Sequence, residues 1–211
     1  MGIKKLNEKI EIKAVLFDFG GVLAEEGFRA GLVAIAENNR LDPTNVIKTA
    51  FRIVYDLGFV TGKAKEGEFW SVFRQQTGIK NSDQILREEI LSRFTLRPWM
   101  LEAVCSLREK GINVGILSDQ TNWLDELNDK YNFFQYFDYV FNSFHSGLSK
   151  KDLKGFEYVL KKINVNPEKV LFIDDHLSNI KRAKAVGMRT IHYKQKEMFI
   201  EELRNFFSII V

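Results

Sequence analysis

The segment 15–23 most constrains the fold of this chain, because an apolar run there ends in one carboxylate, Asp18, followed by Gly20 and Gly21. A continuous apolar run of this kind is typical of a strand buried on both faces of a parallel sheet. Asp18 then stands at the carboxyl end of the strand, where open parallel sheets bind their ligands. Asp18 is therefore a candidate nucleophile or metal ligand. The alternative is an aspartate that only starts a loop or caps a helix.

Apolar strands and helical patterns alternate along the second half of the chain. Further strands are expected at 113–117, 139–141, 170–173 and 188–193, with a loop at 143–150. The intervening helices are expected at 99–110, 122–130, 152–163, after a cap at Ser178, and at 196–207. Alternation at this spacing produces right-handed crossovers and a parallel sheet with helices on both faces. The expected fold class is therefore α/β.

Only helical patterns occur between the first strand and residue 94. Asp42 and Pro43 mark a helix start, because aspartate is a favoured N-cap and proline a favoured first helical residue. Other helices are expected over 27–38, before Gly78 and after Ser82. We therefore expect two domains, which are an α/β core formed by residues 1–24 and 95–211 and a four-helix insertion formed by residues 25–94.

Charge and hydropathy argue against two classes of partner. The chain carries 31 Lys and Arg against 28 Asp and Glu, a net charge of only +3, and its lysines are spread along the sequence. This distribution is not typical of nucleic-acid-binding proteins. No apolar run is long enough to cross a bilayer, and the first nine residues contain no run typical of a signal peptide. We expect a cytoplasmic protein, monomeric or homodimeric, that binds neither nucleic acid nor a membrane.

Polar groups follow the expected strands: Asp18, Ser118, the pair Asp174 and Asp175, and, after the 139–141 strand, Lys150. The carboxyl ends of parallel strands share one edge of a sheet, so these side chains can converge although they are distant in sequence. Asp18 and Asp175 can hold a hard cation such as Mg²⁺, and the Ser118 hydroxyl can hold phosphoryl oxygens. Lys150 supplies positive charge beside Asp18. Asp18 can then attack phosphorus and form an aspartyl-phosphate that water cleaves.

These groups resemble the four sequence motifs of the haloacid dehalogenase (HAD) superfamily, at residues 16–18, 116–118, 150 and 172–175. Gly62 and residues 68–70 resemble the cap segment of members that carry a small helical, C1-type cap. The chain also resembles the subgroup of sugar-phosphate phosphatases and haloacid dehalogenase-like proteins. The resemblance implies a Rossmann-like three-layer core and a mobile helical cap that encloses a small phosphorylated metabolite.

The resemblance also implies roles for individual residues. Asp18 is the nucleophile and a ligand of Mg²⁺, together with Asp175 and the backbone carbonyl of Gly20. Asp174 supports the metal through water or from behind its ligands. Four residues are expected to contact the substrate, one of them also catalytic: Ser118, Asp119, Gly21 and the catalytic Lys150.

The sequence departs from the phosphatases of this superfamily at one important position. They usually carry a second aspartate two residues after the nucleophile, which protonates the leaving alcohol and later activates water, but this chain has Gly20 there. General acid–base catalysis typically contributes about 10²–10⁴ in rate, so slower chemistry is expected unless another group substitutes. Glu25 and Glu26 are the nearest candidates in the sequence. Asp119 stands where asparagine is common and adds a negative charge near the phosphate site.

Three functions are compatible with these residues. The favoured one is a Mg²⁺-dependent phosphatase that hydrolyses a small phosphomonoester through an aspartyl-phosphate on Asp18. The second, motivated by Gly20 and Asp119, is a catalytically weak or inactive HAD-fold protein with a binding or regulatory role. The third is a 2-haloacid dehalogenase, whose halide leaving group needs no acid, although the acidic pair at 174–175 has no role in that reaction. Histidines 145, 176 and 192 are expected to lie outside the catalytic set.

Overall fold

The computed structural model describes residues 11–207 of the 211-residue chain, so the first nine residues, where no signal peptide is expected, lie outside the described range. The five strands are Ala14–Phe17 (β1), Asn113–Ser118 (β2), Tyr139–Asn142 (β3), Val170–Asp174 (β4) and Arg189–His192 (β5). The α-helices of the described range are Gly27–Asn38 (α1), Pro43–Asp56 (α2), Glu66–Thr77 (α3), Asp83–Leu91 (α4), Pro98–Glu109 (α5), Trp123–Tyr131 (α6), Ser143–Ser146 (α7), Leu153–Ile163 (α8), Leu177–Ala185 (α9) and Lys196–Phe206 (α10). Short 3₁₀ helices lie at Phe59–Thr61 (η1), Phe134–Tyr136 (η2) and Pro167–Lys169 (η3). None of the helices in this range combines the length and apolar character that a transmembrane span needs.

The strand order places β1 at the centre of the sheet. The order is β3-β2-β1-β4-β5, and every neighbouring pair is parallel. Val15 pairs with Val114 of β2 on one side and with Leu171 of β4 on the other. The predicted α/β fold is confirmed. The direction of winding reverses beside β1, which is where doubly wound sheets bind ligands.

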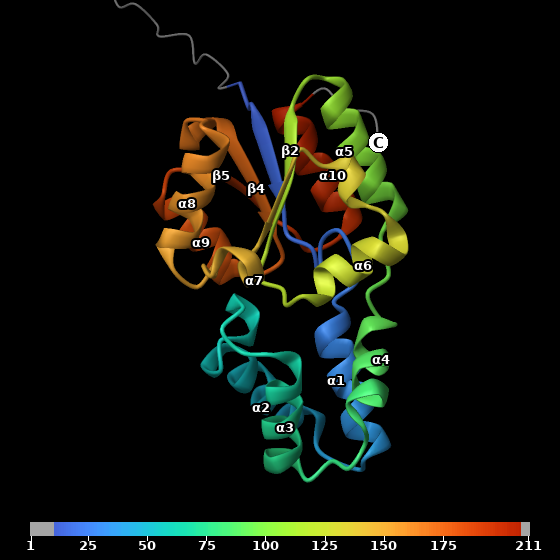
Figure 1. Cartoon of the computed structure of the whole chain (residues 1–211). Helices are drawn as coiled ribbons and strands as arrows, with labels where there is room; N and C mark the ends of the chain where they lie inside the picture. The colour runs from blue at the N-terminus through green and yellow to red at the C-terminus, as the bar shows by residue number, and fades with distance from the viewer. Residues whose placement is uncertain (1–10, 208–211) are drawn as a thin grey trace, which may run out of the picture.

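Helices cover both faces of the sheet, as strands that are apolar throughout require. Val15 and Phe17 of β1 belong to one hydrophobic cluster, together with residues of α5 and α10. Ala14 and Leu16 belong to a second cluster, together with residues of α8 and α9. Figure 1 shows these two pairs of helices on opposite sides of the sheet. The central strand is therefore fixed between two packed layers, and so is the residue that follows it.

The helices α1–α4 follow β1 and lie beyond one end of the sheet (Figure 1). Asp42 caps α2 by accepting a hydrogen bond from the Thr44 N–H at 3.1 Å, and Pro43 is the first helical residue. Ser82 caps α4 in the same way through the Ile85 N–H at 3.4 Å. These local signals explain why the helix starts could be located from the sequence.

The insertion packs on the sheet domain through aromatic side chains. Trp123 of α6 stacks on Trp70 of α3, with ring centroids 5.9 Å apart, and meets Phe59 of η1 edge-on at 5.8 Å. Ser143, at the start of α7, donates its hydroxyl to the carbonyl of Val60 at 2.6 Å. One hydrophobic cluster therefore runs through both parts of the molecule. The division of the chain at residues 24 and 95 stays a prediction.

Two local predictions are wrong. Ser178 does not cap α9, because that helix begins at Leu177, and its N-cap is His176, two residues before the predicted cap. The expected loop at 143–150 begins with one helical turn, α7, whose N-cap Asn142 accepts from the Phe144 N–H at 3.1 Å. Both errors concern a helix start beside the carboxyl edge of the sheet, where strand residues lead directly into a helical turn.

Candidate active site

Asp18 lies directly after β1, at the centre of the carboxyl edge of the sheet. Its N–H donates to the Ile173 carbonyl of β4 at 2.9 Å, which extends the pairing of the strands by one residue. Its Oδ1 accepts hydrogen bonds from the Phe19 N–H and the Ser118 hydroxyl, both at 2.7 Å. The side chain is buried, and burial raises the pKa of Asp18 to about 7, against the opposing effect of Lys150. The ends of β1 and β2 thus bring a carboxylate and a hydroxyl into contact.

Lys150 joins two of the carboxylates. Its Nζ lies 2.7 Å from Asp18 Oδ2 and 2.7 Å from Asp174 Oδ2, and its side chain is only 3 % exposed. Burial alone would lower the pKa of Lys150, but the charges of Asp174 and Asp18 outweigh burial and raise it. The lysine therefore stays protonated and supplies one positive charge between two acidic groups.

Asp174 is fully buried and is held by several donors. Its Oδ1 accepts from the His176 N–H at 2.7 Å, and Asn179 Nδ2 lies 3.2 and 3.0 Å from its two oxygens. Burial opposes ionisation, but Lys150 and the other donors outweigh burial and lower the pKa of Asp174. This carboxylate therefore orients Lys150, and its predicted role in supporting a metal stays a prediction.

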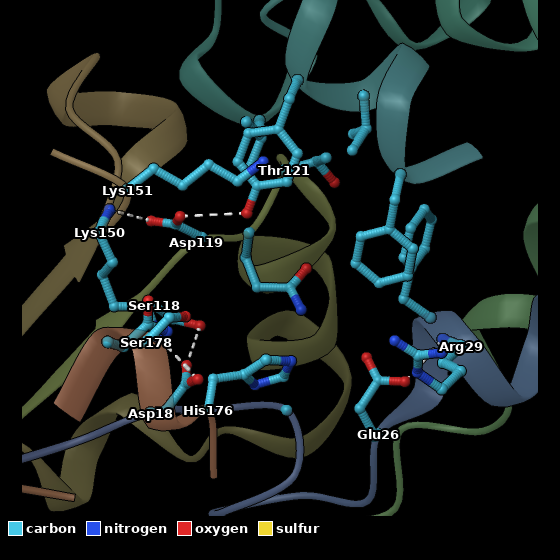
Figure 2. Close-up of a pocket in the computed structure, with 18 of the residues that line it drawn as sticks. Asp18, Glu26, Arg29, Ser118, Asp119, Thr121, Lys150, Lys151, His176 and Ser178 are labelled. Carbon is cyan, nitrogen blue, oxygen red and sulfur yellow. Dashed lines mark hydrogen bonds and ion pairs between the residues drawn. The ribbon is translucent and has the colours of Figure 1, made fainter. Parts of the chain in front are cut away.

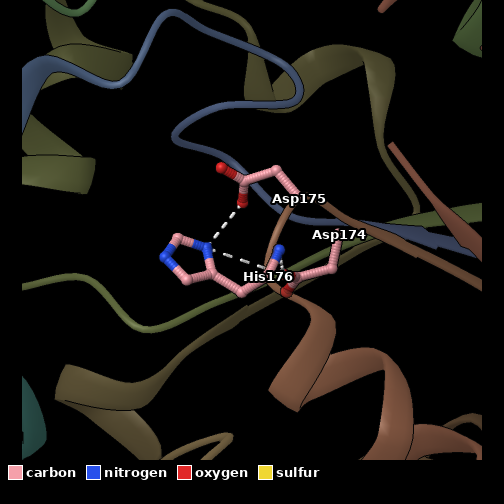
Figure 3. Close-up of side chains that lie close together, drawn as sticks. All are labelled: Asp174, Asp175 and His176. Carbon is pink, nitrogen blue, oxygen red and sulfur yellow. Dashed lines mark hydrogen bonds and ion pairs between the residues drawn. The ribbon is translucent and has the colours of Figure 1, made fainter. Parts of the chain in front are cut away.

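Asp175 is the more exposed carboxylate of the acidic pair. Its Oδ1 lies 2.7 Å from Nδ1 of His176 (Figure 3). Its other oxygen, Oδ2, packs against Gly21 in the turn after β1. The approach is so close that a Cβ built on Gly21 would lie 2.4 Å from this oxygen. One ligand atom from each of Asp174, Asp175 and His176 lies within 4.8 Å of the others. The acidic pair and the glycine turn after β1 therefore meet at one place.

The donors around Asp18 fit a hard divalent cation. Asp18 and Asp175 offer carboxylate oxygens, and Gly20 offers a backbone carbonyl. Mg²⁺ prefers such oxygen ligands, whereas imidazole nitrogen suits softer metals. Nδ1 of His176 is already in contact with Asp175. The chemistry of these donors therefore suits Mg²⁺, and the ligand set of Asp18, Asp175 and the Gly20 carbonyl stays a prediction.

A cavity of about 320 Å³ lies between the sheet domain and the insertion (Figure 2). Its polar floor includes Asp18, Ser118 and Lys150. Apolar side chains form much of the remaining wall, and all but one come from the insertion: Phe28, Phe51, Val54, Val60 and, from α6, Trp123. A cavity of this size and composition is typical of a small-molecule site.

Five of the eight predicted site residues line this cavity, namely Asp18, Gly20, Ser118, Asp119 and Lys150. Asp174 lies behind Lys150, and Asp175 contacts the lining residue His176. Gly21 does not line the cavity, and its carbonyl accepts a hydrogen bond from the Arg97 guanidinium at 2.7 Å. The catalytic and binding roles of the eight residues stay predictions.

Asp119 connects the floor of the cavity to the insertion. Its Oδ1 accepts from the Lys150 N–H at 2.8 Å, and its Oδ2 accepts from the hydroxyls of Ser149 at 2.6 Å and Tyr55 at 3.2 Å. Burial, with the charge of Asp119, raises the pKa of Tyr55, so the phenol keeps its proton and donates. Asp119 therefore connects the loop that contains Lys150 to helix α2. The three hydrogen-bond donors stabilise its negative charge.

Sequence reasoning missed several polar residues of the cavity wall. Tyr55 and Arg29 belong to helices of the insertion, and a helical pattern does not reveal which polar side faces a cavity and which faces solvent. His176 is expected outside the catalytic set, and the structure places it in the lining of the cavity. Its position directly after the acidic pair was the available signal. His145 and His192 do not line the cavity, as expected.

Known proteins resemble this chain over most of its length. A sesquiterpene phosphatase of Aspergillus oryzae is 27 % identical over 200 residues, which cover 91 % of this chain and 95 % of that protein. The bifunctional epoxide hydrolase 2 of Rattus norvegicus is 27 % identical over 217 residues, which cover 91 % of this chain. The chain spans only 38 % of the length of that epoxide hydrolase.

Solved structures and a family model agree on the fold. A HAD family enzyme of Bacteroides thetaiotaomicron, bt-2542, superposes with a TM-score of 0.75 at 24 % identity, over 92 % of this chain and 99 % of that chain. Its complex with magnesium and inorganic phosphate gives a TM-score of 0.69 over 87 % of this chain and 94 % of that chain. The model of the haloacid dehalogenase-like hydrolases matches residues 12–187. This chain therefore belongs to the haloacid dehalogenase-like hydrolase family.

Proposed function

We propose that this chain is a Mg²⁺-dependent phosphatase that hydrolyses a small phosphomonoester through an aspartyl-phosphate on Asp18. The observation that carries the proposal is the contact of Asp18 with a buried, charged Lys150 on the floor of a cavity. Membership of a hydrolase family supports it, as does the sesquiterpene phosphatase among the relatives. The magnesium and phosphate complex of the Bacteroides enzyme supports the choice of metal.

The residues of the floor suit two successive displacements at phosphorus. A carboxylate oxygen of Asp18 attacks phosphorus, and the bond from phosphorus to the leaving oxygen breaks. Lys150 stabilises the negative charge of the phosphoryl oxygens, and the Ser118 hydroxyl, which now donates to Asp18, can turn to one of them. Mg²⁺, when bound, neutralises charge on the same oxygens. Water then attacks phosphorus, and Asp18 leaves as a carboxylate.

The cavity wall favours an apolar organic group on the substrate. A phosphoryl group beside Asp18 leaves the rest of the ester among Phe28, Phe51 and Trp123. Apolar surface buried there contributes roughly 25 cal/mol per Å². A sugar could direct its hydroxyls to the polar part of the wall, at Arg29, Tyr55 and Gln120, but it would leave the aromatic rings uncovered. We therefore place aryl and alkyl phosphates ahead of sugar phosphates as substrates.

The test is release of inorganic phosphate from benzyl phosphate, p-nitrophenyl phosphate, glucose 1-phosphate and acetyl phosphate, with Mg²⁺ and with a chelator. Asp18→Asn keeps the shape of the side chain but removes the anionic nucleophile. We expect it to lower Mg²⁺-dependent release on the order of 10³-fold or more. The exposed Asp129, changed to Asn and purified in the same way, is the matched control, and it should retain full activity.

Other results of these assays would favour one of the two alternative functions. Equal release by both proteins, or none from any ester by either, would support the binding or regulatory alternative. Halide release from 2-chloropropionate without metal would instead support the dehalogenase.

A further inference from the structure

Three side chains lie next to the position that a side chain at residue 20 would occupy. A Cβ built on Gly20 would lie 3.5 Å from Phe94 Cε1, 3.8 Å from Gln120 Nε2 and 4.0 Å from Glu26 Oε1. These are ordinary van der Waals distances, so a side chain at residue 20 would extend toward these groups. Among the three, only Glu26 can give up and take back a proton. A carboxyl group therefore lies close to the position that an aspartate at residue 20 would occupy.

The two carboxylate oxygens of Glu26 differ in their hydrogen bonds within the described residues. It is the N-cap of α1, and its Oε2 accepts from the Arg29 N–H at 2.7 Å. Its Oε1 has no hydrogen-bond partner among residues 11–207. Glu26 lines the same cavity as Asp18, and Figure 2 shows the two residues on two sides of it, with the Glu26 carboxylate directed inward. The cap fixes the direction of the side chain and leaves one oxygen for a ligand.

Glu25, the other candidate from the sequence, points elsewhere. Both of its oxygens are bound by Arg97, with Nε and Nη2 at 2.8 Å each. Glu25 is exposed and does not line the cavity. The structure thus distinguishes two neighbouring glutamates that the sequence left equivalent.

We infer that Glu26 is the general acid and base of this enzyme and performs the role of the aspartate missing at residue 20. The inference rests on the proposed phosphatase reaction. When Asp18 attacks phosphorus, the proton on Glu26 Oε1 moves to the leaving oxygen and forms the alcohol. The resulting Glu26 carboxylate then takes a proton from water while the water oxygen attacks phosphorus and Asp18 departs. The net reaction consumes one water and yields the alcohol and inorganic phosphate.

The surroundings of Glu26 agree with this role. Burial raises the pKa of Glu26 and outweighs the opposing effect of Arg29, whose N–H and positive charge favour the carboxylate, while the negative charge of Asp175 acts in the same direction as burial. A carboxyl group with a raised pKa keeps its proton closer to neutral pH, as an acid in catalysis needs. Gln120 can donate a hydrogen bond to the leaving oxygen but cannot protonate it.

The test compares benzyl phosphate with p-nitrophenyl phosphate, because benzyl alcohol needs protonation to leave and nitrophenolate does not. Glu26→Gln retains an acceptor for the Arg29 N–H but carries no transferable proton. We expect kcat/KM for benzyl phosphate to fall about 10²–10⁴-fold and kcat/KM for p-nitrophenyl phosphate to fall less than about tenfold. Nitrophenol should also appear as a burst, since the variant cannot activate water to cleave the aspartyl-phosphate. Glu25→Gln is the matched control and should behave as the wild type.

Rescue provides a second, independent measurement. Gly20 has room for a side chain, so Gly20→Asp introduced together with Glu26→Gln should recover most of the activity toward benzyl phosphate.

Equal losses of activity toward both substrates in Glu26→Gln, or no loss toward either, would refute the role of Glu26 while leaving the phosphatase intact. A selective loss in His176→Gln instead would assign the proton to the histidine. If wild type and Asp18→Asn release phosphate equally, the proposed phosphatase fails, and the role of Glu26 fails with it.

Discussion

The two adjacent glycines after Asp18 serve different purposes. Gly21 has a φ of +80°, a conformation that residues with a side chain rarely adopt, and a Cβ there would lie 2.4 Å from Asp175 Oδ2. A Cβ on Gly20 would have no contact shorter than 3.5 Å. The turn therefore requires glycine at residue 21 for its backbone, whereas neither the backbone nor the packing requires glycine at residue 20.

This difference predicts unequal effects of alanine at the two positions. Gly21→Ala should lower the free energy of unfolding by about 1–3 kcal/mol, because it adds backbone strain and displaces Asp175. It should also weaken Mg²⁺ binding about 10-fold or more, since that carboxylate is an expected ligand. Gly20→Ala should change the free energy of unfolding by less than about 1 kcal/mol. Thermal unfolding and calorimetric Mg²⁺ titration measure both, and equal effects of the two substitutions would contradict this view of the turn.

At the scale of elements, η1 and α7 connect the insertion to the sheet domain. Phe59 of η1 meets Phe144 of α7 edge-on with ring centroids 6.2 Å apart, next to the hydrogen bond from Ser143 to Val60. Gly62 ends η1 with a φ of +69°, and a Cβ on it would lie 2.4 Å from the Phe144 carbonyl oxygen. The backbones of the two elements therefore approach too closely for any side chain at residue 62.

The contact predicts that Gly62→Ala destabilises the protein more than Gly78→Ala. Gly78 has a similar φ of +75°, but no atom lies within 4 Å of its Cβ position, so alanine there adds only backbone strain. The collision with Phe144 should lower the free energy of unfolding by about a further 1–3 kcal/mol in Gly62→Ala. Denaturant unfolding of the two variants gives the difference directly. Equal losses would show that η1 and α7 are not in close contact.

In the molecule as a whole, the insertion and the sheet domain share one apolar core. Trp123 is a residue of the sheet domain, yet it packs among Phe28, Phe59 and Trp70 of the insertion. The same interface forms the apolar wall of the cavity. Movement of the insertion away from the sheet would separate these rings and expose apolar surface, which costs roughly 25 cal/mol per Å². Packing between the two parts therefore favours a closed cavity.

The floor of the site could be predicted from the sequence because the sheet determines it. Residues at the carboxyl ends of neighbouring parallel strands must lie at one edge of the sheet, which is why Asp18, Ser118 and Asp174 converge. The wall could not be predicted, because it depends on how the insertion docks. Glu25 and Glu26 are adjacent and chemically alike, and only the turn into α1 directs one toward Arg97 and the other into the cavity.

Trapping of the covalent intermediate tests the central claim most directly. The wild type and Glu26→Gln would be incubated with p-nitrophenyl phosphate and Mg²⁺, quenched in acid and reduced with borohydride, which converts an aspartyl-phosphate to homoserine. We expect peptide mass spectrometry to find homoserine at residue 18, in a larger fraction of Glu26→Gln because its intermediate is cleaved slowly, and none in Asp18→Asn. Turnover of the ester with no modification at residue 18, or with modification at another carboxylate, would contradict the nucleophilic role of Asp18.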